Sequence, residues 1–113
     1  NFIKKIILKK SIEIHSNGLQ KRDFIYVEDV CEALINELNN KFKSTELKIN
    51  TNKFLSILTL KSCLDEISKK NNNFKHIKTP DGYDDRIYKK PSFKVQKKLM
   101  KNLELTYNWY KSL

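Results

Sequence analysis

The segment "NGLQKRDFIYVEDV" (residues 17–30) contains the signals for a turn, an extended strand and a helix in close succession. Asn17 and Gly18 predict the turn, because both residue types tolerate positive φ. The run "RDFIYV" predicts an extended segment. Asp29 is placed to cap a helix, and Glu32 three residues later completes a capping-box pattern. This order of elements indicates a chain that alternates strands with helices.

The residues before this segment continue the alternation. Residues 2–10 place isoleucines at helical spacing against lysines, which predicts a short amphipathic helix. In residues 11–16, Ile12 and Ile14 alternate with polar residues, as in a half-exposed strand. The helix predicted after the opening segment has an apolar face made of Val27, Val30, Cys31, Leu34 and Leu38.

The second half of the chain repeats the pattern. We predict strands over residues 45–50 and 74–80, a polar, aromatic loop over 81–91, and a short terminal turn for the aromatic end, residues 105–113. Ser56 is placed to cap a helix whose stripe is Ile57, Leu60, Leu64 and Ile67, with Lys69 and Lys70 in its last turn. A basic helix is predicted from Ser92, with Val95, Leu99 and Leu103 on its apolar side. These elements together favour the α/β class.

The composition sets further bounds. A length of 113 residues allows one small domain. Of the 23 basic residues, 21 are lysines and two are arginines. The net charge of +10 suits an anionic partner such as nucleic acid, an acidic membrane surface or a phosphorylated small molecule. Lysines scattered along the whole chain also fit a general compositional bias that leaves solvated faces.

Cysteine use and hydropathy bear on the cellular compartment. Cys31 and Cys63 both fall on apolar helical positions, so we expect reduced thiols in the core of a cytoplasmic protein. No apolar run reaches the length needed to cross a bilayer. The sequence starts at Asn1 and its one methionine is Met100, which suggests a piece of a longer polypeptide.

Arg22 and Arg86 are the chain's two arginines, and each lies in a segment with a glycine and flanking aromatic residues. Arginine differs from lysine in its planar fork, which binds phosphate or carboxylate through two parallel hydrogen bonds. The alternative is structural ion pairing, of Arg22 with Asp23, Glu28 or Asp29 and of Arg86 with Asp84 or Asp85.

Residues 18–29 resemble a known family. The positions that match its pattern G-x-Q-x-R-D-[F/W]-[I/L]-[Y/H]-V-x-D are Gly18, Gln20, Arg22, Asp23, Phe24, Ile25, Tyr26, Val27 and Asp29. This pattern is similar to that of the extended short-chain dehydrogenase/reductases of the NAD-dependent epimerase/dehydratase family, which act on nucleotide sugars. Residues 49–60 resemble the family's returning strand and following helix, with Asn52 where glycine is usual, and "GYDDRIY" (residues 82–88) resembles its later arginine loop.

The resemblance implies a fold and a site. It makes residues 1–113 the carboxy-terminal, substrate-binding portion of an extended Rossmann-type enzyme, with one strand returning to the cofactor-binding sheet. It assigns Arg22 and Arg86 to the diphosphate of a nucleoside-diphosphate sugar, and His15 to the neighbourhood of the base or ribose. NAD or NADP would be bound by an upstream Rossmann domain outside this chain, because Gly18 and Gly82 are its two glycines and cannot form a glycine-rich turn.

The residues offer no catalytic or metal centre of their own. Tyr107 and Lys111 have the family's Tyr-x-x-x-Lys spacing, but they lie at the end of the chain, beyond the elements that would hold a cofactor. The cysteines and the two histidines, His15 and His76, do not approach a zinc-binding spacing. We therefore assign no catalytic, cofactor-binding or metal-binding residue here.

Three functional hypotheses follow. The chain is part of an NAD(P)-dependent nucleotide-sugar epimerase, dehydratase or reductase and is inactive alone, or it is a truncated or split homologue that only binds. The third is a small basic nucleic-acid-binding protein, for which no RNA-binding fingerprint is present. We expect the helix after Asp29 and the strand at residues 46–50 to expose apolar surface, and so predict a homo-oligomer or a complex with a partner chain.

Overall fold

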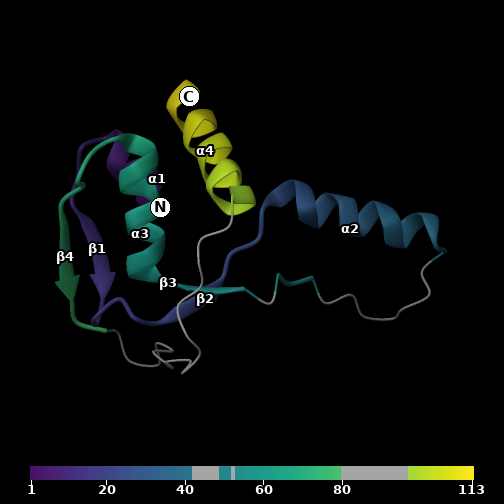
Figure 1. Ribbon diagram of the computed structural model, residues 1–113, viewed down its shortest axis with the longest axis horizontal. Coiled ribbons are helices and arrows are strands. Elements are labelled where there is room, and N and C mark those ends of the chain that lie inside the picture. Colours follow the sequence, from purple (N-terminus) through teal and green to yellow (C-terminus); the bar gives the residue numbers. More distant parts are fainter. Residues whose placement is uncertain (42–48, 52, 80–96) are drawn as a thin grey trace.

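The computed structural model describes residues 1–41, 49–51, 53–79 and 97–113, which form an α/β structure with parallel strands (Figure 1). Its elements, in chain order, are α1 (Phe2–Ile7), β1 (Ile12–His15), β2 (Lys21–Asp23), α2 (Val27–Asn39), β3 (Phe54–Ser56), α3 (Ile57–Ser68), β4 (Phe74–Ile77) and α4 (Lys97–Ser112).

The core forms where helices cover a parallel pair of strands. β1 and β4 pair in parallel, from Ile12 opposite Phe74 to His15 opposite Ile77. The alternation predicted for residues 11–16 is confirmed, because Ile12 and Ile14 are buried while Glu13 between them is exposed. Ile6 of α1 and Leu64 of α3 complete the buried cluster. α4 packs against α3 and α1, and Leu103 and Tyr107 cover the cluster from that side.

A second pair of strands leads away from this core. β2 and β3 are antiparallel, with Arg22 opposite Leu55. Beyond β2 the chain enters α2, which projects from the body of the molecule (Figure 1). The β2–β3 pair is therefore the link between the packed α/β core and α2.

The ends of α3 show one prediction confirmed and one wrong. Ser56 caps the helix as predicted, and its hydroxyl accepts a hydrogen bond of 3.0 Å from the Thr59 amide. Lys69 and Lys70 do not lie in the last turn. The helix ends at Ser68, and Lys69 is the C-cap in the left-handed region at φ 54°. This left-handed residue terminates the helix, so Lys69 and Lys70 lie beyond the last turn of α3.

Lys61 is buried on α3, which the apolar stripe did not predict. Its ammonium donates to Asp65 Oδ2 at 2.5 Å and lies 4.8 Å from the centre of the Phe74 ring. The other Asp65 oxygen accepts from the backbone and side-chain amides of Asn72 at 3.1 and 2.7 Å. This cluster joins the end of α3 to the start of β4 and so holds β4 beside β1.

The Asp65 cluster predicts a loss of stability in acid. Burial works to raise the pKa of Asp65, but the hydrogen bonds from Lys61 and Asn72 outweigh it and hold the pKa below its usual value. A carboxyl with a depressed folded-state pKa stabilises the fold above its unfolded pKa, and this contribution disappears as pH falls through the folded value. We expect Asp65→Asn to cost about 2 kcal/mol at neutral pH and to flatten the acid limb of a Tm-against-pH curve. A parallel acid limb in the variant would contradict this assignment, and Glu66→Gln, on the exposed side of α3, is the control.

The predicted start of α2 is wrong by three residues. The helix begins at Val27, its N-cap is Tyr26 in an extended conformation, and no side chain caps it. Asp29 lies inside the first turn, where its carboxylate accepts a 3.0 Å hydrogen bond from Lys98 of α4. The pairing with a helix far along the chain replaces the local capping that the sequence suggested.

The apolar face of α2 is exposed, as we expected from the resemblance. No residue of α2 is buried. The prediction of a core thiol is confirmed for Cys63 but wrong for Cys31, which is exposed on this face. The periodic pattern correctly identified an apolar stripe, but a stripe is buried only where another element packs against it.

The aromatic end of the chain is also corrected. Residues 105–112 continue α4 as regular helix, and the short terminal turn predicted there does not form. Several predictions lie outside the described residues, namely most of the strand at 45–50, Asn52, the loop with Arg86, and the start of the last helix at Ser92 with Val95. Within the described ranges, no helix combines the length and hydropathy that a bilayer crossing requires.

Candidate functional site

The turn after β1 is built around Gly18. Gly18 has φ +72°, as predicted for this position, and its amide donates to the His15 carbonyl at 3.3 Å. The Asn17 side chain accepts from the Leu19 backbone amide at 3.0 Å, and the buried Gln20 side chain donates through Nε2 to the His15 carbonyl at 3.0 Å. These contacts hold the chain between β1 and β2 in one conformation.

The same turn docks on the start of α3. The carbonyls of Gly18 and Gln20 accept hydrogen bonds from the amides of Leu58 and Ile57 at 3.1 and 3.2 Å. Ser56 satisfies the next amide, that of Thr59. The first amides of a helix commonly bind anions, but here the protein itself uses them. The helix N-terminus is therefore a structural anchor for the turn and not a phosphate site.

Gly18→Ala tests this anchor. A Cβ at this position would lie 2.8 Å from both Ile14 Cγ2 and Leu58 Cγ, and positive φ adds backbone strain. We expect a loss of about 3 kcal/mol in the free energy of unfolding by urea denaturation. Asn17→Ala is the control, since it removes one exposed hydrogen bond and should cost about 1 kcal/mol. Equal effects of the two substitutions would show that the docking at Gly18 is not critical.

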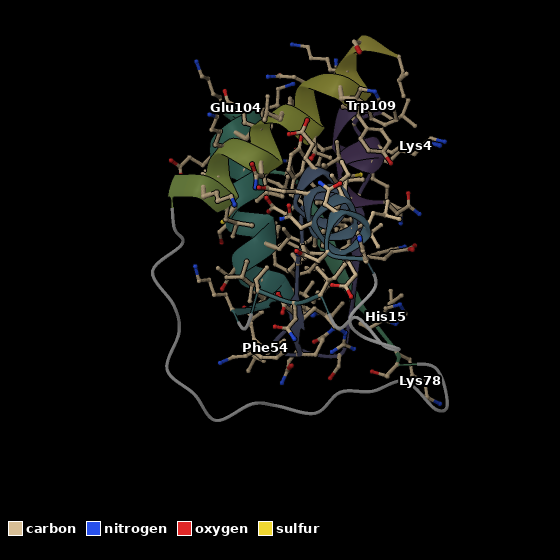
Figure 2. The ribbon with its side chains drawn as sticks, turned by 90° about the vertical axis from the view of Figure 1, so that its right-hand side faces the viewer. Lys4, His15, Phe54, Lys78, Glu104 and Trp109 are labelled. Atoms are coloured by element: carbon tan, nitrogen blue, oxygen red, sulfur yellow. The ribbon has the colours of Figure 1, made fainter. Side chains whose placement is uncertain are left out.

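The turn places two of the predicted site residues at one end of the molecule. His15 is the last residue of β1 and Arg22 is the middle residue of β2, and both are half-buried. Arg22 Nη1 donates to the Lys21 carbonyl at 2.8 Å, which holds the guanidinium beside its own strand. Figure 2 shows His15 and Phe54 of β3 at this end, with Trp109 at the opposite one. Arg86, the third predicted residue, lies outside the described residues.

Two carboxylates that we considered as partners of Arg22 have other contacts. Asp23 accepts from the Thr51 amide at 2.8 Å and from the Thr51 hydroxyl. Asp29 accepts from Lys98. Asp23 thus ties β2 to the segment that leads into β3, and it holds the strand that carries Arg22.

A groove that the sequence did not predict lies between the start of α2 and α4. It has a volume of about 620 Å³, and its lining includes Phe24, Tyr26, Asp29, Thr51, Lys98 and Asn102. The Asp29–Lys98 ion pair joins the lining residues of α2 and α4. The two residues are distant in sequence, and Asp29 resembles a helix cap locally, so no local signal could have revealed their pairing.

Contacts within the fold also shift the pKa values of Glu13 and Cys63. Lys5 and Lys75 flank Glu13 on β1; the hydrogen bond and charge of Lys5, helped by Lys75, lower the pKa of that carboxyl. Burial, with a smaller effect from Glu66, raises the pKa of the Cys63 thiol, which makes it a poor nucleophile. Among the described residues, no group of three His, Cys, Asp or Glu side chains is arranged to hold a metal ion.

Tyr107 and Lys111 lie on the last helix, remote from the Gly18 turn. Tyr107 packs against the core cluster and Lys111 is exposed in the last turn of α4. In Figure 1 the end of α4 lies at the opposite end of the molecule from β2 and β3. The spacing of this pair is that of one turn of a helix that packs on the core through Tyr107.

The Gly18 turn does not fit a dinucleotide. Dinucleotide-binding turns leave space beside their glycines so that the backbone can approach the pyrophosphate. Beside Gly18 that space is filled by the side chains of Ile14 and Leu58. A cofactor such as NAD would need residues other than those of this turn.

Comparisons with known proteins agree with the resemblance. Residues 1–50 match the model of the NAD dependent epimerase/dehydratase family. No protein of curated function matches the chain in sequence. The whole chain is similar in fold to solved structures of enzymes that act on nucleotide sugars.

Three of these structures span the group. UDP-N-acetylglucosamine 4-epimerase from Methanobrevibacter ruminantium, in complex with UDP-N-acetylmuramic acid, has a TM-score of 0.78 and 24% identity over 98% of this chain. UDP-glucuronic acid 4-epimerase from Bacillus cereus, in complex with NAD, has a TM-score of 0.73 and 26% identity over 98%. dTDP-glucose 4,6-dehydratase from Bacillus anthracis, also in complex with NAD, has a TM-score of 0.70 and 21% identity over 97%.

The match covers only part of each relative. This chain corresponds to 38%, 36% and 37% of the lengths of those three proteins. It is therefore similar to nucleotide-sugar epimerases and dehydratases over less than two fifths of their length. The activity of a whole enzyme of this kind does not transfer to these 113 residues by similarity alone.

Proposed function

We propose that the chain supplies the nucleoside-diphosphate-sugar binding side of an NAD(P)-dependent nucleotide-sugar epimerase, dehydratase or reductase. In this proposal Arg22 and Arg86 bind the diphosphate, and His15 lies near the base or ribose. The observation that carries it is the Gly18 turn, which places Arg22 and His15 at one end of the molecule inside the segment that matches the family.

The local structure suits Arg22 to such a role. A guanidinium has several N–H donors, and one of those on Arg22 is used to orient the side chain against the Lys21 carbonyl. Asp23 and Thr51 hold the same strand in place, so the fork is positioned before a ligand arrives. Preorganisation of this kind reduces the entropy cost of binding.

The redox chemistry would come from elsewhere. NAD or NADP would supply hydride transfer, and the residues that hold it would belong to an upstream Rossmann-type portion. The role of this chain would be to bind and orient the sugar nucleotide without exchanging a proton or hydride with it. A binding-only homologue has the same local requirements and differs only in lacking that portion.

Arg22→Lys tests the diphosphate contact directly. The substitution keeps the charge and removes the planar fork, so we expect UDP affinity measured by calorimetry to fall about tenfold. The loss should be smaller for UMP, which has one phosphate group fewer. Arg86→Lys should behave in the same way, and Lys53→Arg, an exposed site, is the control with the opposite exchange.

Two results would contradict the proposal. Unchanged UDP affinity in both arginine variants would remove the diphosphate contact and favour structural ion pairs. Binding of single-stranded RNA that exceeds UDP binding and falls steeply with salt would instead support the nucleic-acid hypothesis.

A further inference from the structure

Ser16, the residue between the end of β1 and the Gly18 turn, has a strained backbone. Its φ of 52° lies in the left-handed region, which a residue with a Cβ adopts only at a cost in energy. Such a conformation persists only where surrounding contacts hold it. His15 comes directly before Ser16, and Asn17 and Gly18 of the turn come directly after it. Whatever holds Ser16 therefore also holds the end of β1.

β4 contacts both backbone polar groups of Ser16. The Ser16 amide donates to the Ile77 carbonyl at 3.1 Å and so continues the parallel pairing beyond β1. The Ser16 carbonyl accepts from the His76 ring, with Nδ1 2.5 Å from the oxygen. A carbonyl oxygen has no proton to donate, so Nδ1 of His76 must carry one. Figure 2 shows His15 and Lys78, which lie at the ends of these strands, at the same end of the molecule.

Contacts along β4 connect His76 to the interior of the fold. Side chains two residues apart on a strand point to the same face, and the rings of His76 and Phe74 meet edge to face with centres 5.4 Å apart. The Phe74 ring lies 4.8 Å from the ammonium of Lys61, which binds Asp65. A series of contacts thus runs from α3 through β4 to the Ser16 carbonyl.

The turn is therefore held from two sides. Gly18 and Gln20 both donate to the His15 carbonyl, and the turn docks on the start of α3. His76 adds a bond from β4, on a strand that is distant in sequence, to the peptide between Ser16 and the turn. Rotation of that peptide would move the His15 side chain on one side and the chain that leads to β2 on the other.

We propose that His76 is a positioning residue for the sugar-nucleotide site. By donating from Nδ1 to the Ser16 carbonyl, it holds the end of β1 in the conformation that places His15 and Arg22 for the ligand. This inference rests on the proposed function of His15 and Arg22. His76 acts through the backbone, and because a bidentate contact from arginine depends on geometry, a small displacement of the turn lowers the affinity for the ligand.

NMR of the ¹⁵N-labelled chain tests the role of His76 at the turn without any ligand. The ¹⁵N shifts of the His76 ring report which nitrogen carries the proton, and we expect Nδ1. His76→Phe keeps a ring and removes the donor, so the amides of Gly18 and Leu58, which bond within and onto the turn, should exchange with solvent about tenfold faster. The amide of Leu64, which is buried in α3, is the control for a general loss of stability and should not change.

Two amide substitutions separate the hydrogen bond from the stability of the strand. His76→Asn places a donor near the position of Nδ1, and His76→Gln places one near the position of Nε2. We expect UDP affinity, measured by calorimetry, to stay within about twofold in His76→Asn and to fall about fivefold in His76→Gln and His76→Phe. Asparagine is depleted in strands, so a general loss of strand stability would give the opposite order of the two amide variants.

Four outcomes would overturn the proposal. A proton on Nε2 alone, or unchanged exchange of the turn amides in His76→Phe, would exclude the contact that holds the turn. Equal UDP affinities in His76→Asn and His76→Gln, or a loss in Arg22→Lys with none in His76→Phe, would remove the positioning role and leave the proposed function standing. Failure of the proposed function is distinct, because UDP affinity would then be unchanged in the arginine variants as well.

Discussion

The docking of the Gly18 turn on the start of α3 is the contact on which the rest of the structure depends. Two backbone hydrogen bonds, from Leu58 to Gly18 and from Ile57 to Gln20, join segments that are far apart in sequence. They fix the position of β2 relative to β1, and β2 in turn pairs with β3 next to α3. Because the turn closes the end of the core, the placement of His15 and Arg22 follows from it.

The composition of the chain affects how its turns are made. Lys9, Ser16, Lys41 and Lys69 all have positive φ, a conformation that glycine adopts at lower cost. Gly18 is different, because its position also lacks room for a Cβ. Glycine therefore occupies the position where both packing and backbone conformation exclude a side chain. At the other positive-φ positions lysine or serine is present, at the cost of some backbone strain. Arg22 stands out against the same lysine-rich background, as one of two arginines among 23 basic residues.

The described residues contain one packed core and one helix outside it. The β1–β4 pair with α1, α3 and α4 buries a core of its own. α2 buries none of its residues. An amphipathic helix gains most of its stability from packing of its apolar face, so α2 is the element whose stability depends on a contact outside the described core.

Sequence alone determined the local elements with clear signals: the alternation in β1, the cap at Ser56, the apolar stripes of α2 and α3, and the Asn17–Gly18 turn. It also predicted a phosphate-binding role for Arg22, through a motif whose spacing is local. Only the tertiary structure decided that Asp29 pairs with Lys98 instead of capping α2, that Cys31 is exposed, and that Lys61 is buried beside Asp65 and Phe74. The physical reason is that periodicity shows which face of an element is apolar, whereas burial and ion pairing depend on which distant element, if any, packs against that face.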